Sequence, residues 1–265
     1  MTLAADTVLS RNGDGRFRGE VSEDWWIERG PFGGYLSAFL MRALLAELDD
    51  PLRPPQSLTV HFVDAPRAGP IDVSVAVERA GRSSTALSLR LEQDGRPIAL
   101  ALAGASVWRE GEPEWADLRA PAAPPPEECP EVPRVSGAPR FQERFDLRWV
   151  EGGAPGRPSE RARHLAWMRL KEGGPLDHLA VTAMSDGWMP AAFSKLGRFA
   201  IVPTFDLTIH FRAPLPAPGE YLLAEYRSAV SAGGAWEEDG ELWAQDGTLV
   251  AQSRQLAMMR ERRRR

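Results

Sequence analysis

The side chains best suited to acid–base or nucleophilic chemistry are four histidines and one cysteine. His61 and His210 lie in matching segments, Leu-Thr-Val-His-Phe and Leu-Thr-Ile-His-Phe, and a repeated position favours a shared structural role over a single active site. Asp177 next to His178 is too small a group of ligands to predict a metal site. The chain also lacks the Gly-x-Ser-x-Gly elbow of serine hydrolases and the glycine-rich loop that cradles nucleotide phosphates.

Cys129 is the only cysteine of the chain, which excludes an internal disulfide and a thiolate metal cluster. It lies in the segment Pro-Glu-Glu-Cys-Pro-Glu-Val-Pro, where the neighbouring carboxylates disfavour the thiolate that a nucleophile requires. We therefore interpret it as an unreactive thiol in a mobile, acidic linker.

Charge and composition narrow the class of protein further. The formal net charge of −5 gives no sign of a nucleic-acid partner, and the basic run 260–265 is expected to be a solvated end. No apolar stretch approaches the roughly 20 residues that a membrane-spanning helix needs. The first residues lack the features of a secretory signal, so a cytoplasmic protein without a membrane partner is expected.

The chain shows weak internal similarity at long range. Residues 58–66 resemble residues 207–214, and His210 follows His61 by 149 residues. Residues 93–99 resemble residues 245–251, at an offset of 152 residues. The sequence therefore predicts two similar domains, 1–110 and 141–265. The proline-rich segment 111–140 between them favours extended backbone and is predicted to be a linker.

Hydrophobic periodicity predicts one helix followed by strands in each half. In the first half we expect a helix over 34–48, ended by Asp49-Asp50-Pro51, and strands over 57–62, 71–77, 85–91 and 98–108. In the second half we expect a helix over 190–196 and strands over 205–212, 221–230, 235–244 and 249–259. A helix followed by an antiparallel meander is typical of an α+β fold whose sheet wraps one face around the helix.

Several of these segments resemble the hotdog superfamily, and specifically the double-hotdog acyl-CoA thioesterases of type II. The resemblance rests on the glycine-rich segment 30–36 before the first long helix and on segments 184–191, 203–211 and 251–259. It implies two tandem hotdog domains, each an antiparallel sheet around a central helix, which together form a pseudo-dimer. It also implies hydrolysis of an acyl-CoA to a free acid and CoA, in fatty acid metabolism, without a metal or another cofactor.

The resemblance also implies a site. In the family an aspartate at the start of the second-half helix, a threonine or serine on the next strand and a glutamine on the last strand hold a water molecule. Matched motif by motif, these residues fall on Asp186, Thr204 and Gln255. The substrate contacts are expected at Gly33, Gly34, Tyr35 and Trp188, and the unpaired N–H groups of the Gly33-Gly34 helix start could polarise the thioester carbonyl.

Each of these residues also has a structural interpretation. Asp186 could cap a helix, and threonine is common at a strand start such as Thr204. Gln255 stands among apolar residues, where an amide needs a partner. Gln252 is on the same predicted strand but of opposite parity, so only one of the two glutamines faces the site unless a bulge intervenes.

Two other functions stay open. A non-catalytic acyl-CoA-binding protein would keep the pocket without turnover, and a hydratase or dehydratase would need an Asp or Glu with His, for which no segment is convincing. A homodimer or a larger homo-oligomer is expected. The acyl chain length is not specified by the sequence.

Overall fold

The computed structural model describes residues 2–27, 30–109, 111–133, 139–153, 157–198 and 200–259. The basic run 260–265 lies outside the described residues. Within the described ranges, no helix is long and apolar enough to cross a membrane.

The N-terminal half combines one long helix with antiparallel strands. Its elements are α1 (Leu3–Asp6), β1 (Ser10–Arg11), β2 (Arg16–Val21), the 3-10 helix η1 (Glu23–Trp25), α2 (Gly33–Leu48), β3 (Pro55–Phe62), β4 (Gly69–Ala80), β5 (Ser84–Gln93) and β6 (Arg96–Ser106). The predicted helix and the four strands after it are confirmed, and the elements before α2 are additional.

The C-terminal half repeats this plan with shorter helices. Its elements are η2 (Pro126–Glu128), η3 (Arg140–Arg144), β7 (Phe145–Gly152), β8 (Ala162–Leu170), α3 (His178–Met184), α4 (Ala192–Leu196), β9 (Thr204–Phe211), β10 (Leu222–Ser228), β11 (Ser231–Ala232), β12 (Ala235–Trp243) and β13 (Leu249–Met258). The predicted helix near 190–196 and the four later strands are confirmed. The sequence did not indicate β7, β8 and α3.

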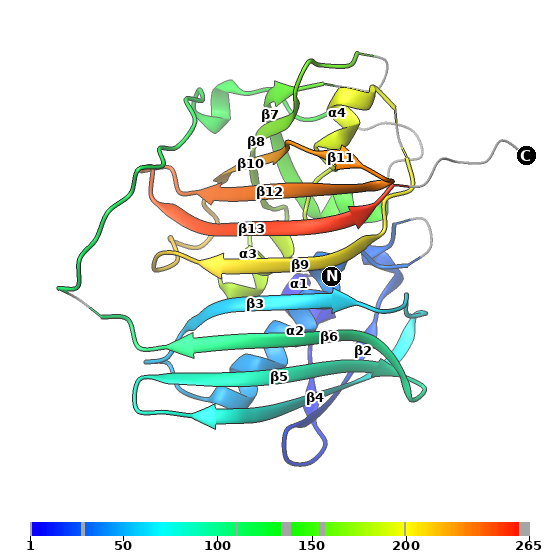
Figure 1. Cartoon of the computed structure of the whole chain (residues 1–265), viewed down its shortest axis with the longest axis vertical. Coiled ribbons are helices and arrows are strands. Elements are labelled where there is room, and N and C mark those ends of the chain that lie inside the picture. The colour runs from blue at the N-terminus through cyan, green and yellow to red at the C-terminus, as the bar shows by residue number, and fades with distance from the viewer. Residues whose placement is uncertain are drawn as a thin grey trace, which may run out of the picture.

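The strands of both halves join one antiparallel sheet, in the order β1-β2-β4-β5-β6-β3-β9-β13-β12-β10-β8-β7, with β11 paired to β12 (Figure 1). The halves meet where β3 pairs with β9. At this seam Thr59 lies opposite Thr208, with their hydroxyl oxygens 3.1 Å apart. The two threonines are 149 residues apart, which is the offset of the sequence repeat. The seam therefore relates equivalent strands of the two halves.

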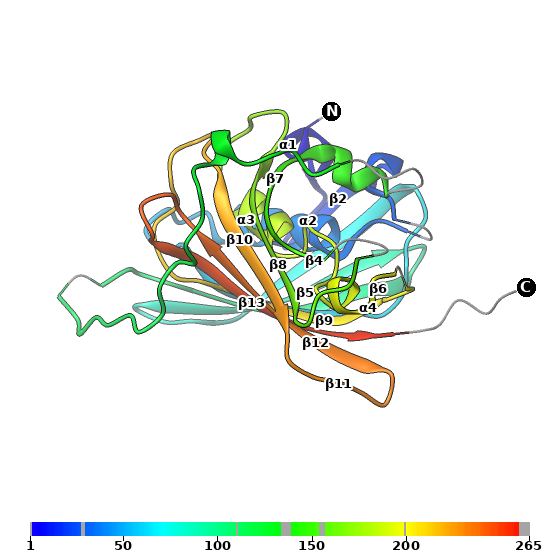
Figure 2. The ribbon, with the colours of Figure 1, turned by 90° about the horizontal axis from the view of Figure 1, so that it is seen from above.

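The core lies between the concave face of the sheet and the helices. Figure 2 shows the sheet bending around α2 and α3. Helix α2 buries a continuous apolar stripe that includes Leu36, Phe39 and Leu40, and α3 packs directly against it. Gly34 permits this close packing, because a Cβ there would lie 2.6 Å from the Ala183 carbonyl oxygen. Asp49 ends α2 in the left-handed region, with φ 41°.

The second-half helices require a correction to the expected place of Asp186. The expectation put this residue at the start of a helix. Instead α3 begins after the capping residue Asp177, whose side chain accepts from the Ala180 N–H, and it ends at Met184. Asp186 follows the end of α3, and α4 begins only at Ala192. Asp186 therefore caps neither helix of its own half.

The segment predicted to be a mobile linker is in part packed on the C-terminal half. Cys129 is buried with Leu165 and Trp167 against the face of the sheet opposite the core, and the Trp167 indole N–H donates to the Pro124 carbonyl at 2.8 Å. The prediction that Cys129 lies in a mobile linker was therefore wrong. The apolar side chains on this face of the sheet need cover from water, and the segment around Cys129 supplies it. Burial and the charges of Glu127 and Glu128 raise the pKa of the thiol, as expected for an unreactive cysteine.

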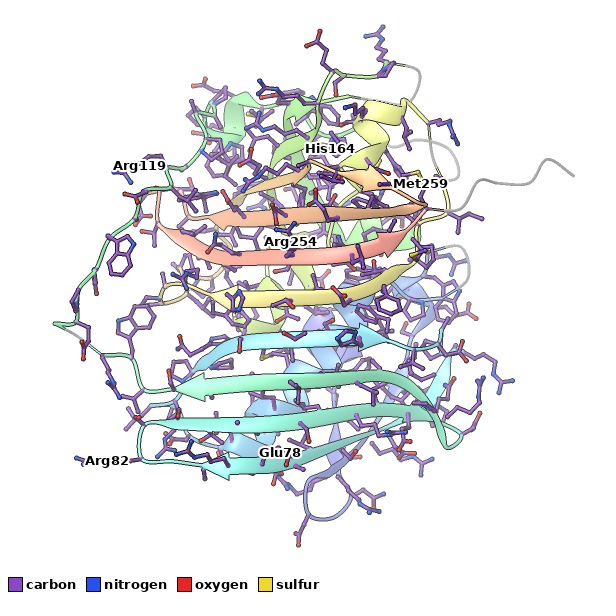
Figure 3. The ribbon with its side chains drawn as sticks, viewed as in Figure 1. Glu78, Arg82, Arg119, His164, Arg254 and Met259 are labelled. Carbon is purple, nitrogen blue, oxygen red and sulfur yellow. The ribbon has the colours of Figure 1, made fainter. Side chains whose placement is uncertain are left out.

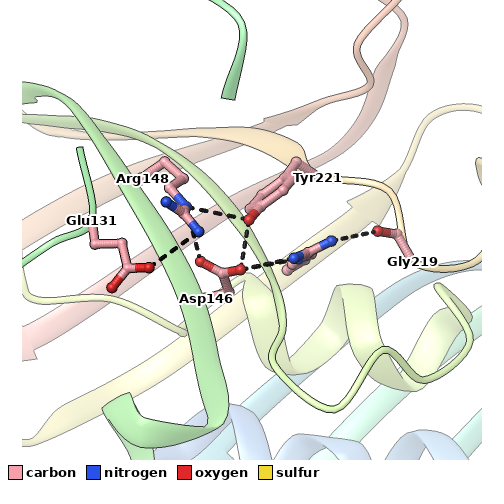
Figure 4. A network of polar contacts seen from close by, with 6 residues as sticks. Glu131, Asp146, Arg148, Gly219 and Tyr221 are labelled. Atoms are coloured by element: carbon pink, nitrogen blue, oxygen red, sulfur yellow. Dashed lines mark hydrogen bonds and ion pairs between the residues drawn. The ribbon is translucent and has the colours of Figure 1, made fainter. Parts of the chain in front are cut away.

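A polar network fixes the same segment to the outer strands, as Figure 4 shows. Glu131 pairs with Arg148 at 3.3 Å, and Arg148 contacts Asp146 at 3.1 Å. Asp146 also accepts from the Tyr221 hydroxyl at 2.6 Å and pairs with Arg169 at 2.9 Å. Hydrogen bonds and nearby arginines outweigh burial and lower the pKa of Asp146. This network anchors the segment at the strand edge, away from the core.

Candidate active site

Asp186 reaches from the C-terminal half to the start of helix α2 in the N-terminal half. Its Oδ2 accepts the Gly34 N–H at 2.9 Å, and the N–H of Gly33 also contributes a hydrogen bond. Phe32, which precedes α2, supplies no side-chain cap of its own. Asp186 therefore caps α2 across the seam, at the helix end whose dipole favours an anion.

The glycine at the start of α2 makes room for this carboxylate. A Cβ at Gly33 would lie 2.9 Å from Oδ2 of Asp186 and 2.8 Å from the ring of Phe62. Both distances are shorter than ordinary contacts, so an alanine there would displace the acid or the ring. The glycine-rich segment singled out in the sequence therefore serves the approach of Asp186 to the helix.

Thr204 and Gln255 meet on the inner face of the sheet. The Thr204 hydroxyl donates to Oε1 of Gln255 at 3.0 Å. A bulge between β9 and β13 skips Phe205, which is 52% exposed, and this brings Thr204 to the same face as Gln255. Gln255 is 6% exposed.

The structure also decides between the two glutamines on β13. Arg254, the neighbour of Gln255, lies on the open face of the sheet, toward the viewer in Figure 3. Gln252 has the parity of Arg254 and pairs with His210, which is exposed. Gln255, and not Gln252, is therefore the glutamine that lies beside Thr204 and Asp186.

Glu238 on β12 is a member of this cluster that the sequence reasoning missed. It pairs directly with Gln255 in the sheet and accepts a hydrogen bond from its Nε2 at 2.7 Å. The other carboxyl oxygen accepts the N–H of Ala191. One signal was available, because acids occupy both parities of this strand, at Glu237 and Glu238, so one of them had to face inward.

Both carboxyl groups have raised pKa values. Burial raises the pKa of Asp186 to about 6, against hydrogen bonds from Gly34, Gln255 and Gly33 that lower it. Burial raises the pKa of Glu238 to about 8, against hydrogen bonds from Ala191 and Gln255, and the charge of Asp186 raises it further. Asp186 keeps part of its surface exposed, whereas Glu238 is only 4% exposed. Asp186 has the lower pKa of the two, so it is the carboxyl group that ionises first as the pH rises.

Tyr35 and Trp188, expected at the substrate, lie in the core. The Tyr35 hydroxyl donates to the Asp6 carbonyl at 2.8 Å, and its ring stacks on Trp25 with centroids 5.2 Å apart. Burial raises the pKa of this phenol. Trp188 stacks on His164, with ring centroids 5.6 Å apart. None of these contacts of Tyr35 and Trp188 involves Asp186, Thr204 or Gln255.

His61 and His210 are not part of the cluster. His61 and His210 are exposed on β3 and β9, where His61 lies opposite Asp206 and His210 opposite Ser57. Their matching positions therefore belong to the seam between the halves. Over the described ranges, no group of His, Cys, Asp and Glu side chains is arranged to hold a metal ion.

Comparison with known proteins identifies the family. Residues 21–108 match the model of the acyl-CoA thioesterase N-terminal domain, and residues 126–259 match that of the acyl-CoA thioesterase C-terminal domain. No curated protein matches.

Solved structures agree over almost the whole chain. A conserved protein of unknown function with a hot dog fold from Alicyclobacillus acidocaldarius is 28% identical, with 98% of each chain covered and a TM-score of 0.90. A protein assigned as a thioesterase II from Thermobifida fusca YX is 29% identical, with 98% of each chain covered and a TM-score of 0.86. An acyl-CoA thioesterase II from Mycobacterium marinum, 23% identical over 98% of this chain and 99% of that one, has the same fold with a TM-score of 0.79. The chain therefore has the hotdog fold, belongs to the acyl-CoA thioesterase family and is a thioester hydrolase.

Proposed function

We propose that the protein hydrolyses an acyl-CoA to a free acid and CoA with a water molecule held by Asp186, Thr204 and Gln255. The observation that carries this proposal is the meeting of these three side chains at the start of α2, where Asp186 is bound by the Gly34 N–H. We further propose that the halves are two tandem hotdog domains that work as one pseudo-dimer, because the site takes its helix from one half and its side chains from the other.

In the proposed reaction Asp186 acts as the general base. It takes a proton from water while the water oxygen bonds to the thioester carbon, and the C–S bond then breaks. The proton passes to the departing CoA thiolate, which leaves the free acid. A carboxylate with a pKa of about 6 is ionised at neutral pH and is a stronger base than an ordinary aspartate.

Thr204 and Gln255 orient the water in this scheme. The Thr204 hydroxyl donates its hydrogen to Gln255, so its oxygen lone pairs are left to accept a hydrogen bond from the water. Holding the water at a fixed angle beside the base removes part of the entropic barrier. The N–H groups at the start of α2 are occupied by Asp186, so we assign them to the base and not to the substrate carbonyl.

Release of CoA from short, medium, long and aromatic acyl-CoAs tests the proposal. Asp186→Asn keeps the size of the side chain but removes the base, and kcat should fall by about 10²- to 10⁴-fold. Wild-type kcat/KM should rise with pH through about 6 as Asp186 ionises. Asp206→Asn is the matched control, because Asp206 lies on the same strand as Thr204 but pairs with His61 at the seam.

Two results would contradict the proposal. Full CoA release by Asp186→Asn would remove this residue from the role of base. Binding of acyl-CoA by the wild type without release from any member of the panel would favour the binding protein instead.

A further inference from the structure

The carboxyl group of Glu238 is buried, and it forms no ion pair with any residue that the structure describes. Both of its oxygens accept hydrogen bonds from N–H groups, one from Gln255 and one from Ala191. Withdrawing a carboxyl group from water opposes folding unless hydrogen bonds or charges replace the water. Such a group in the core therefore calls for an explanation other than packing.

A second buried glutamate on the same strand has a different partner. Glu241 is 3% exposed, but its carboxylate pairs with Arg227 at 2.8 Å. It pairs in the sheet with Gln252, on the opposite face from Gln255. Glu241 is thus compensated by a cation, whereas Glu238 is directed at an amide of the proposed site.

The N-terminal half shows that the fold does not require a carboxyl group here. On β9, the residue before Thr208 pairs with Gln255 of β13, and Gln255 pairs with Glu238 of β12. On β3, the residue before Thr59 pairs with Ala103 of β6, and Ala103 pairs with Leu87 of β5. Leu87 and Ala103 are both buried. An apolar pair therefore fills the equivalent place in the same sheet.

We propose that Glu238 is a positioning residue of the thioesterase site, which fixes the amide plane of Gln255 by accepting a hydrogen of its Nε2. This inference rests on the proposed function of Asp186, Thr204 and Gln255. It extends that function to a residue that need not touch the substrate.

The chemistry of the amide explains why an anchor matters. The two ends of a glutamine amide have nearly the same shape, but one donates and the other accepts. With Nε2 held by Glu238 at 2.7 Å, Oε1 is the end that faces the Thr204 hydroxyl at 3.0 Å. The Ala191 N–H holds the second oxygen of Glu238 and so fixes the anchor itself. Rotation of the amide by half a turn would place Oε1 against the Glu238 oxygen, so that two acceptors face each other, and would leave Nε2 where the Thr204 hydroxyl needs an acceptor.

Glu238→Gln tests this role, since the new amide can accept from only one of its two N–H neighbours. We expect kcat to fall by about 10- to 100-fold with KM unchanged, as when a reacting group is slightly misplaced. Glu238→Leu, which copies Leu87, should lower kcat in the same way. It replaces Glu238→Gln as the test if that variant is unstable. Glu241→Gln is the matched control and should leave kcat unchanged, because Arg227 keeps its contact with Glu225.

A double-mutant cycle separates positioning from a general effect on folding. In a Gln255→Ala background, Glu238→Gln should cause no further loss of kcat, because the group it positions is gone. An unchanged kcat in Glu238→Gln and Glu238→Leu, or full additivity with Gln255→Ala, would overturn the proposal.

The side-chain amide signals of Gln255, assigned by their loss in Gln255→Ala, give a readout that does not depend on turnover. Hydrogen exchange at Nε2 should be slow in the wild type and in Glu241→Gln, and fast in Glu238→Gln. Absence of CoA release from the wild type would refute the proposed function, while this exchange would still decide the role of Glu238. Equal exchange in all three proteins would refute the anchor.

Discussion

The two halves of the sheet share a framework but differ in the side chains that they place at equivalent positions. In both halves a bulge interrupts the strand at the seam, at Gln56 in one and at Phe205 in the other. The register then gives three matched pairs, Pro55 with Thr204, Leu87 with Glu238 and Ala103 with Gln255. The polar member of each pair lies in the C-terminal half.

This difference separates the requirements of the fold from those of the site. The N-terminal half fills the three places with proline, leucine and alanine, so the packing is satisfied by apolar side chains. The C-terminal half buries an amide and a carboxyl there, which oppose folding unless they are hydrogen-bonded. The N-terminal half supplies instead the glycine-rich start of α2 that binds Asp186. This division predicts one site per chain, built from both halves.

Exchanging the residues of one matched pair should have the largest effect. Gln255→Ala copies Ala103 and should lower kcat/KM by roughly 100-fold, because the partner of Thr204 and Asp186 is lost. Ala103→Gln should leave kcat unchanged but lower the free energy of unfolding by about 1–3 kcal/mol, because it buries an amide without a partner. CoA release and urea denaturation measure the two effects.

Opposite results would break the comparison. If Ala103→Gln lowered kcat as much as Gln255→Ala, or if Gln255→Ala retained full activity, the two places would not differ in function.

The C-terminal half also buries an imidazole, which should make it sensitive to acid. His164 is labelled in Figure 3 and packs against the rings of Trp149 and Trp188, where burial lowers its pKa to about 4. The unfolded chain binds the proton near pH 6.5, so stability is lost as the pH falls from about 6.5 to 4. His164→Phe should remove this loss. Between pH 7 and pH 4.5 the melting temperature of His164→Phe should therefore fall less than that of the wild type. The exposed His61, changed to Phe, is the control. Equal acid sensitivity of His164→Phe and wild type would contradict the prediction.

The smallest effect is expected at the seam itself. Thr208→Val keeps the branched shape that suits a strand but removes the hydrogen bond to Thr59, so the free energy of unfolding should fall by about 0.5–1 kcal/mol. Thr59→Val combined with Thr208→Val should recover part of the loss, because no hydroxyl is then left without its partner. Denaturation of the single and double variants measures this, and a loss several times larger would mean that the seam depends on this contact.

Elements with a clear period were predictable from the sequence, and those without one were not. Helix α2 carries apolar residues at helical spacing along its sixteen residues, and the strands from β3 to β6 alternate, so their periods are visible. Strand β8 is covered on both faces, by the core and by the segment around Cys129, so its residues do not alternate. Helix α3 has seven residues, too few to show a helical period.

The repeat, the helix α2, most strands and the candidate residues Asp186, Thr204 and Gln255 could be predicted from the sequence, because these depend on local pattern and on similarity to known motifs. How these residues meet depends on the tertiary fold. The bulge turns Thr204 inward, the register selects Gln255 over Gln252 and brings Glu238 beside it, and the packing of α3 on α2 carries Asp186 to the Gly34 N–H. Each depends on pairing between residues far apart in the chain, since the side on which a strand residue lies changes with a shift of one position.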